Sequence, residues 1–117
     1  MKFEQLTVWQ KALDLSAAIH SLTRKFPKEE QYVLTSQLRR AVVSIPSNIS
    51  EGKGRNSKKE YIQFLYISRG SAFESMTLIQ LSEKLGYLTK KQTDELLTTL
   101  NEISAMLSGL IRSQENL

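Results

Sequence analysis

Two long rows of apolar residues, in which spacings of four and three alternate, constrain the fold of this chain most. The first row runs from Val8 to Phe26 and the second from Leu96 to Leu110. This spacing places each row on one face of an α-helix, as in the seam of a left-handed helical bundle. The members are Val8, Ala12, Leu15, Ile19, Leu22 and Phe26 in the first row, and Leu96, Leu100, Ile103, Leu107 and Leu110 in the second. No segment shows the alternation of a strand, so the chain is predicted to be all-α.

The segment between these rows contains a second helix, which is predicted to start at Pro27 and to reach Ile49. Proline fits the first turn of a helix, and the carboxylates of Glu29 and Glu30 favour the positive end of the helix dipole. Pro46 inside this helix lacks the N–H that the hydrogen-bond ladder needs. Two outcomes therefore remain open: one helix with a bend, or two helices that meet at Pro46.

Three copies of the pattern Ser/Thr-x-x-Glu/Gln mark predicted helix starts, because each side chain of such a pair can satisfy a free backbone N–H. The pairs are Thr7 with Gln10, Ser57 with Glu60, and Thr89 with Gln92. They place the starts of the first, third and fourth helices. Gly86 is expected to end the third helix, which is predicted to be the longest, and the tail from Ser113 to Leu117 is expected to fray.

The links between the four predicted helices contain only a few residues, which forces each helix to run antiparallel to the one before it. The fold class is therefore an all-α, antiparallel, up-down-up-down four-helix bundle. The whole chain, residues 1–117, is predicted to form one domain. Small residues at Gly70–Ala72 predict the close approach of a neighbouring helix to the third one, and Trp9 is expected to pack there.

Composition excludes several classes of protein. The chain has no cysteine, which excludes disulfides, a cysteine nucleophile and thiolate metal sites and fits a reducing cytoplasm. Its single histidine, His20, leaves no multi-histidine metal site, and no Glu-x-x-His motif of a di-iron bundle is present. We find no signal peptide and no apolar run of the roughly 18 residues that a membrane span needs. The expectation is a cytoplasmic protein that is not an enzyme and has no metal, cofactor or membrane segment.

Positive charge is concentrated in one part of the chain. The formal net charge is +4, whereas the segment from Arg39 to Arg69 alone holds seven bases and two acids. These are Arg39, Arg40, Lys53, Arg55, Lys58, Lys59 and Arg69, with Glu51 and Glu60. A local excess of this kind suits a polyanion or an acidic partner. The alternative is a solvated loop that only keeps the protein soluble.

The loop between the second and third helices is the candidate binding site. Its sequence GKGRNS combines glycines, bases and a helix start, which are suitable for an anion site. Gly52 and Gly54 are expected to end the second helix and to allow a tight turn. The loop follows a helix and lacks the spacing GxxxxGK[ST], so nucleotide hydrolysis is not expected. The residues assigned to RNA or DNA binding are Arg39, Lys53, Arg55, Lys58 and Lys59.

A polar row on the second helix is open to two interpretations. Its members are Gln37, Arg40, Ser44 and Asn48, followed by Glu51. In the structural interpretation the row forms hydrogen bonds inside the bundle or between protomers, and Arg40 pairs with Glu51 or Glu74. In the functional interpretation it lines a groove or channel and contacts a ligand. Arg39, about 100° further around the helix, is expected to be better placed than Arg40 for solvent and for nucleic acid.

The same region carries a family resemblance. The run RRAVVSIPSNISEGKGR, with VWQKALDL before it and FLYISRGSAFE after it, resembles the four-helix-bundle proteins encoded within intervening sequences of bacterial 23S ribosomal RNA genes. The resemblance extends over nearly the whole chain and implies a homopentamer with nucleic-acid association and no known catalysis. The family is related to the accessory bundle of diversity-generating retroelements, which implies a protein partner. Aromatic residues off the inner rows, which would suit a subunit interface, are Tyr32, Phe64, Tyr66 and Phe73.

The predicted function is therefore a non-enzymatic homo-oligomer that binds RNA or DNA electrostatically through the basic loop. The alternative is a scaffold or accessory subunit that binds a protein and does not contact nucleic acid directly.

Overall fold

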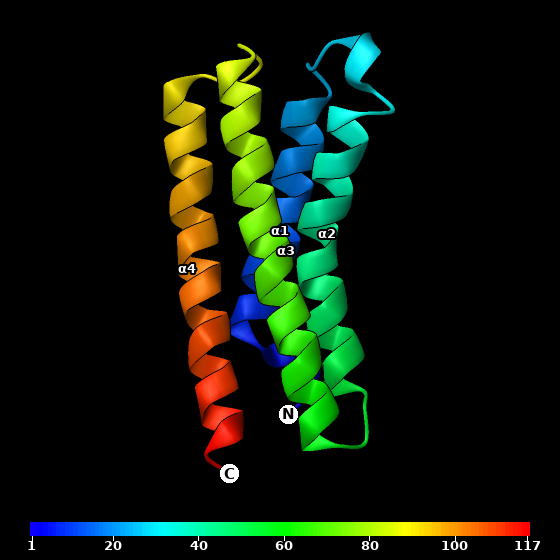
Figure 1. Cartoon of the computed structure of the whole chain (residues 1–117), viewed down its shortest axis with the longest axis vertical. Helices are drawn as coiled ribbons and strands as arrows, with labels where there is room; N and C mark the ends of the chain where they lie inside the picture. Colours follow the sequence, from blue (N-terminus) through cyan, green and yellow to red (C-terminus); the bar gives the residue numbers. More distant parts are fainter.

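The computed structural model describes all 117 residues and contains four long α-helices that pack side by side (Figure 1). The helices are α1 (Thr7–Thr23), α2 (Leu34–Lys53), α3 (Lys58–Lys84) and α4 (Lys90–Glu115), with short 3-10 turns η1 (Phe3–Gln5) and η2 (Lys28–Glu30). Successive helices run in opposite directions, in a bundle of 46 × 24 × 20 Å. The α1–α2 and α3–α4 connections lie at one end, and the α2–α3 connection and both termini lie at the other (Figure 1). The prediction of an all-α four-helix bundle is confirmed.

The predicted apolar rows form the core. Twenty-two buried apolar residues make one continuous cluster to which all four helices contribute. Every member of the two rows is buried except Leu22 and Leu110, which pack against the cluster at its edge. Full burial of one large aliphatic side chain stabilises a fold by about 1.5–3 kcal/mol, so this cluster is the main force that holds the helices together. None of the four helices has the length together with the apolarity of a transmembrane span.

Small residues set the contact between α2 and α3, which is the most extensive helix pair. A Cβ atom on Gly52, in the last turn of α2, would lie 2.6 Å from the Cβ atom of Phe64. Further along the pair, the buried hydroxyl of Ser68 donates a hydrogen bond to the backbone oxygen of Ile45 over 2.8 Å. The absence of bulk at these positions lets the two helices approach closely.

The start of α2 differs from the prediction. The helix begins at Leu34 and not at Pro27, which instead precedes the 3-10 turn η2. In this turn the carboxylate of Glu30 accepts a hydrogen bond of 2.9 Å from the hydroxyl of Tyr87. Glu30 therefore connects η2 to the other corner at the same end of the bundle, instead of lying in the first turn of α2.

The end of α2 also differs from the prediction. The helix continues without interruption through the buried Pro46 to Lys53, so the alternative of two separate helices is wrong. It also passes through Gly52, and Gly54 caps it with a φ of −80°. Gly54 thus ends the helix as predicted, whereas Gly52 does not end it but lies in its last turn, and neither glycine has a positive φ. Gly52 serves helix packing and Gly54 is an ordinary C-cap residue.

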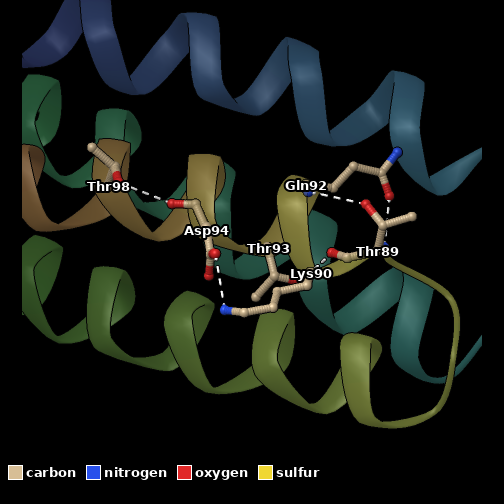
Figure 2. Close-up of polar contacts among 6 residues, drawn as sticks. All are labelled: Thr89, Lys90, Gln92, Thr93, Asp94 and Thr98. Carbon is tan, nitrogen blue, oxygen red and sulfur yellow. Dashed lines mark hydrogen bonds and ion pairs between the residues drawn. The ribbon is translucent and has the colours of Figure 1, made fainter.

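The fourth helix starts with the predicted reciprocal cap (Figure 2). The backbone N–H of Gln92 donates to Thr89 Oγ1 over 3.0 Å, and the N–H of Thr89 donates to Gln92 Oε1 over 2.9 Å. One turn further, Lys90 pairs with Asp94 over 3.0 Å, and this hydrogen bond raises the pKa of Lys90. The third helix has half of the predicted arrangement, since Ser57 Oγ accepts from the N–H of Glu60 over 3.1 Å without a reciprocal contact.

The cap predicted at Thr7 is wrong. Thr7 is the first helical residue, and Leu6 occupies the cap position without a side-chain hydrogen bond. The amide of Gln10 does not return to Thr7 but donates to the backbone oxygen of Glu4 over 2.8 Å. The side chain of Gln10 is therefore bonded to η1 and is not available to cap α1.

Two further expectations are corrected at helix α3 and at the tail. The close approach predicted for Gly70–Ala72 involves Ser71, whose hydroxyl bonds to Ser44 of α2 over 2.9 Å, and Ala72, which is fully buried. Gly70 itself is exposed, and a Cβ atom there would meet nothing within 4 Å. Trp9 packs edge-on against Phe3 with ring centroids 5.3 Å apart. The tail does not fray at Ser113, because α4 remains helical to Glu115. Helix α3 is the longest with 27 residues, and Gly86 ends the turn after it with a φ of 84°, both as predicted.

Candidate nucleic-acid interface

The α2–α3 corner, which we define as residues 51–61, stands at one end of the bundle (Figure 1). Most of its side chains are exposed. The last turn of α2 closes it on one side, where the N–H of Gly54 donates to the backbone oxygen of Ser50 over 3.1 Å. The Ser57 cap opens α3 on the other side. The structure brings four of the five residues predicted to bind nucleic acid into this corner: Lys53, Arg55, Lys58 and Lys59.

The three lysines of the corner have no carboxylate side chain as a partner. Lys53 is half-buried, and its Nζ lies 5.3 Å from the centroid of the Tyr61 ring. Lys58 Nζ donates to the backbone oxygen of Leu117 over 2.7 Å, and Lys59 is exposed. Lys59 is therefore open to an external anion, whereas Lys53 and Lys58 would exchange their contacts with the Tyr61 ring and the Leu117 oxygen for one.

Arg55, in contrast, is held by the acids of the corner. One of its terminal nitrogens lies 2.7 Å from Glu51 Oε1, and its Nε lies 3.9 Å from Glu60 Oε2. The guanidinium also stacks on the ring of Phe64 at 4.9 Å. Surface ion pairs contribute about 0–1 kcal/mol, so an incoming phosphate can replace these carboxylates at little cost. With both acids included, the corner carries two positive charges in excess.

The aromatic rings near the corner are already covered. Lys53 lies over Tyr61, whose hydroxyl is buried without a hydrogen-bond partner, and burial raises the pKa of this tyrosine. Tyr66 carries the guanidinium of Arg69 at 4.9 Å from its ring. A cation therefore occupies one face of each of these rings, and Tyr61 is also buried, which reduces the ring surface open to a nucleic-acid base. The corner can therefore attract a polyanion by charge, and base stacking is not its main resource.

Arg39, the fifth residue in the predicted set, lies away from the corner. Its Nε donates to Thr23 Oγ1 over 2.8 Å and its Nη2 donates to the backbone oxygen of His20 over 3.2 Å. These bonds fasten α2 to the end of α1. The expected exposures of Arg39 and Arg40 are reversed, since Arg39 is half-buried and Arg40 is exposed.

The polar row on α2 forms hydrogen bonds within α2 and between α2 and α3. Asn48 Nδ2 donates to the backbone oxygen and the hydroxyl of Ser44, over 2.7 and 2.8 Å. Ser71 of α3 donates to the same hydroxyl over 2.9 Å. Gln37 reaches Glu74 over 3.4 Å. These are the contacts that the structural interpretation of the row requires.

Arg40 is the member of the row that does not fit. The predicted pairing with Glu51 or Glu74 does not occur within the chain, because Glu51 pairs with Arg55 and Glu74 faces Gln37. A pairing between protomers stays a prediction. Arg40 is exposed and makes no ion pair. Its charge adds to the surface of α2 without a structural role inside the chain.

Two residues that support these sites were missed in the sequence. Ser71 and Thr23 lie within helices, and no spacing in the sequence relates them to their partners. Only the packed structure shows that Ser71 contacts Ser44 and that Thr23 contacts Arg39. The lone His20 lies with its Nδ1 at 3.3 Å from the backbone oxygen of Ser16. No group of three or more histidine or acidic side chains is close enough to hold a metal ion.

Comparison with known proteins places these features in context. A family model described as 23S rRNA-intervening sequence protein matches residues 4–109. The crystal structure of a protein with unknown function from the S23 ribosomal protein family of Bacteroides thetaiotaomicron is similar to this chain, with a TM-score of 0.85 and 26% sequence identity. The match covers 96% of this chain and 99% of that chain. A search of curated proteins gave no match.

Proposed function

This chain belongs to the 23S rRNA-intervening sequence protein family, and from that premise we propose that it is a non-catalytic bundle that binds RNA or DNA electrostatically through the α2–α3 corner. The observation that supports this proposal best is the group formed by Lys53, Lys58 and Lys59 at one end of the molecule. None of these lysines pairs with an aspartate or glutamate side chain, although Lys58 is bonded to the backbone oxygen of Leu117. Phosphate contacts made by such lysines release counterions, which gives affinity without sequence selectivity.

Assembly of several subunits would raise the affinity that a site of only a few cations can reach. We propose that the chain forms a homo-oligomer, and the family resemblance implies a homopentamer. Several corners on one assembly would present several weak phosphate sites, and a strand that reaches more than one of them gains avidity. Sedimentation or native mass measurement would give the number of subunits.

The test compares two groups of three lysines at opposite ends of the bundle. The first variant replaces Lys53, Lys58 and Lys59 with glutamine, and the matched control replaces Lys84, Lys90 and Lys91 next to the α3–α4 connection. Fluorescence anisotropy with a single-stranded RNA should show weaker binding for the first variant and unchanged binding for the control. The slope of log affinity against log salt should fall by about 2 when three phosphate contacts are lost. Equal binding by the first variant and the parent at moderate salt would contradict the proposal.

A second candidate function is an accessory subunit that binds a protein and not nucleic acid. The observation that favours it is an apolar stretch on the outer face of α3. Tyr66, Ile67, Phe73 and Leu81 are between 43% and 50% exposed, and Gly70 stands open between them. Exposed apolar patches often mark protein interfaces. A pull-down from lysate beside a gel shift with mixed RNA would separate the two functions.

A further inference from the structure

A pocket of about 170 Å³ opens between the end of α1 and the start of α2. The α1–α2 connection lies at the opposite end of the bundle from the α2–α3 corner (Figure 1). Eight residues line this α1–α2 pocket: Thr23, Arg24, Phe26, Pro27, Lys28, Gln31, Thr35 and Arg39. Three of them are cations and none is a carboxylate. The pocket is much larger than the space of one water molecule, which is about 30 Å³ in the liquid.

The positive charge of the pocket is not compensated by the protein. No ion pair in the structure includes Arg24, Lys28 or Arg39. Glu29 and Glu30 are on the adjoining turn but do not line the pocket, and Glu30 directs its carboxylate to the tyrosine hydroxyl described above. Three like charges around one pocket repel one another, and a bound anion would remove that repulsion.

Arg39 is held in place for such an anion. Its two hydrogen bonds to Thr23 Oγ1 and to the backbone oxygen of His20 use two of its five N–H groups. Thr23 is itself fixed, because its hydroxyl donates to the backbone oxygen of Ile19 over 2.7 Å. A guanidinium whose orientation is already fixed loses little conformational freedom when its remaining N–H groups bind a ligand.

A second observation at the same pocket also indicates a ligand. Thr35 is 5% exposed, and its hydroxyl oxygen is buried without a hydrogen-bond partner. Buried polar atoms usually have a partner, so this hydroxyl calls for an explanation. Thr35 lines the pocket, and a rotation about its Cα–Cβ bond exchanges the hydroxyl with the methyl group. A bound anion would then supply the missing acceptor.

We propose that the α1–α2 pocket binds a phosphate group, through the side chains of Arg24, Lys28 and Arg39 and the hydroxyl of Thr35. Guanidinium groups form charge-assisted, two-point hydrogen bonds with phosphate oxygens, and a dianion matches a cluster of three cations. The same chemistry is carried by free phosphate and by the terminal phosphate of a nucleic acid. This site is separate from the α2–α3 corner and does not depend on the function proposed for it.

The test is a titration of the full chain, labelled with ¹⁵N, with inorganic phosphate at constant ionic strength. Saturable shifts are expected for the Thr35 amide and for the Arg39 Nε resonance. The variant with both Arg24→Gln and Lys28→Gln and the variant Thr35→Val should each weaken phosphate binding by about tenfold or more. Arg24 and Lys28 are exposed, and valine keeps the shape of threonine, so these variants should remain folded. The control variant with Lys84→Gln and Lys91→Gln should bind phosphate like the parent.

The source of the phosphate is found by comparing an oligonucleotide that has a 5′-phosphate with the same one that has a 5′-hydroxyl. Tighter binding of the 5′-phosphate form, lost in Thr35→Val, supports the pocket and assigns it a nucleic-acid terminus. Equal binding of both forms, together with saturable inorganic phosphate, supports it and assigns free phosphate. Shifts that do not saturate, or an equal weakening in the control, would overturn the proposal. The corner variant of Lys53, Lys58 and Lys59 should leave the phosphate titration unchanged, which separates this result from the test of the corner.

Discussion

The α2–α3 corner and the α3–α4 corner (residues 85–89) both turn the chain between antiparallel helices, but they use their side chains differently. At the α3–α4 corner Gly86 adopts a left-handed conformation, Leu88 is buried, and Tyr87 binds Glu30 and packs on Phe26 with ring centroids 5.3 Å apart. The α2–α3 corner has no left-handed residue, and its side chains between the two helices are exposed. Exposed loop residues that make no packing contact are available to a binding partner. The α3–α4 corner therefore stabilises the bundle, whereas the α2–α3 corner can bind a partner.

Gly52→Ala should have the largest effect on stability. Its Cβ atom would lie 2.6 Å from that of Phe64, so α2 and α3 must separate, at a cost of about 1–3 kcal/mol. The matched control is Gly54→Ala, where a Cβ atom meets nothing closer than 3.6 Å and φ is already right-handed. This control should be neutral or should stabilise by up to about 1 kcal/mol. Urea unfolding measures both, and equal losses for the two variants would contradict the packing role of Gly52.

Gly86→Ala should have the next largest effect. The positive φ of 84° costs a residue with a side chain about 1–2 kcal/mol, although a Cβ atom there would meet no neighbour within 4 Å. The loss of unfolding free energy would therefore come from the backbone alone. Gly54→Ala in the other corner again serves as the control. A neutral Gly86→Ala would show that the two corners do not differ in backbone constraint.

Loss of the helix caps should have a smaller effect. Removing an N-cap hydroxyl costs about 1 kcal/mol, so Ser57→Ala and Thr89→Ala should both destabilise the bundle. Thr89→Ala combined with Gln92→Ala should cost more than Ser57→Ala, because the Thr89 and Gln92 side chains satisfy two backbone N–H groups whereas Ser57 satisfies one. Thermal or urea unfolding of these variants provides the comparison. A larger loss for Ser57→Ala than for the double variant would reverse the assignment of the α3–α4 corner as the more firmly built one.

Tyr87→Phe should change the pH dependence of stability by the smallest amount. The hydrogen bond to Glu30, followed by burial and the charges of Glu30 and Glu29, raises the pKa of Tyr87 above its usual value of 10.0. The folded state therefore holds the phenolic proton more tightly than the unfolded chain, which stabilises the fold below pH 10. This contribution is lost as the pH rises through the folded pKa.

The phenylalanine variant should thus lose less stability than the parent between pH 7 and pH values above 10. Tyr61, whose pKa is raised by burial, remains in both proteins and sets the common background. Thermal unfolding across this range measures the difference. Identical pH profiles would show that the link between Tyr87 and Glu30 does not persist in solution.

The core of the fold was predictable because helical periodicity determines which side is buried before any partner is known. The rows of Val8 and Leu96 needed no tertiary information. Helix starts were less predictable, since the three copies of one pattern that were assigned to helix starts have three outcomes. It gave a full cap at Thr89, a half cap at Ser57 and none at Thr7, where the preceding turn takes the side chain of Gln10.

The candidate site was predictable in position but not in its contacts. The spacing of four between Glu51 and Arg55 is a sequence signal for an ion pair, which the structure contains. The contact of Arg39 with Thr23 has no such signal, because it joins residues 16 positions apart on different helices. The hydroxyl of Thr35 is left without a partner only through packing, so no reading of the sequence could locate it.

The most direct test of the central claim is an NMR map of the ¹⁵N-labelled chain as single-stranded RNA is added at low and moderate salt. The account predicts that the amide shifts cluster at residues 51–61 and shrink as salt rises, while residues 85–89 remain unchanged. Shifts that cluster at residues 85–89 or on the outer face of α3, or that do not respond to salt, would contradict it.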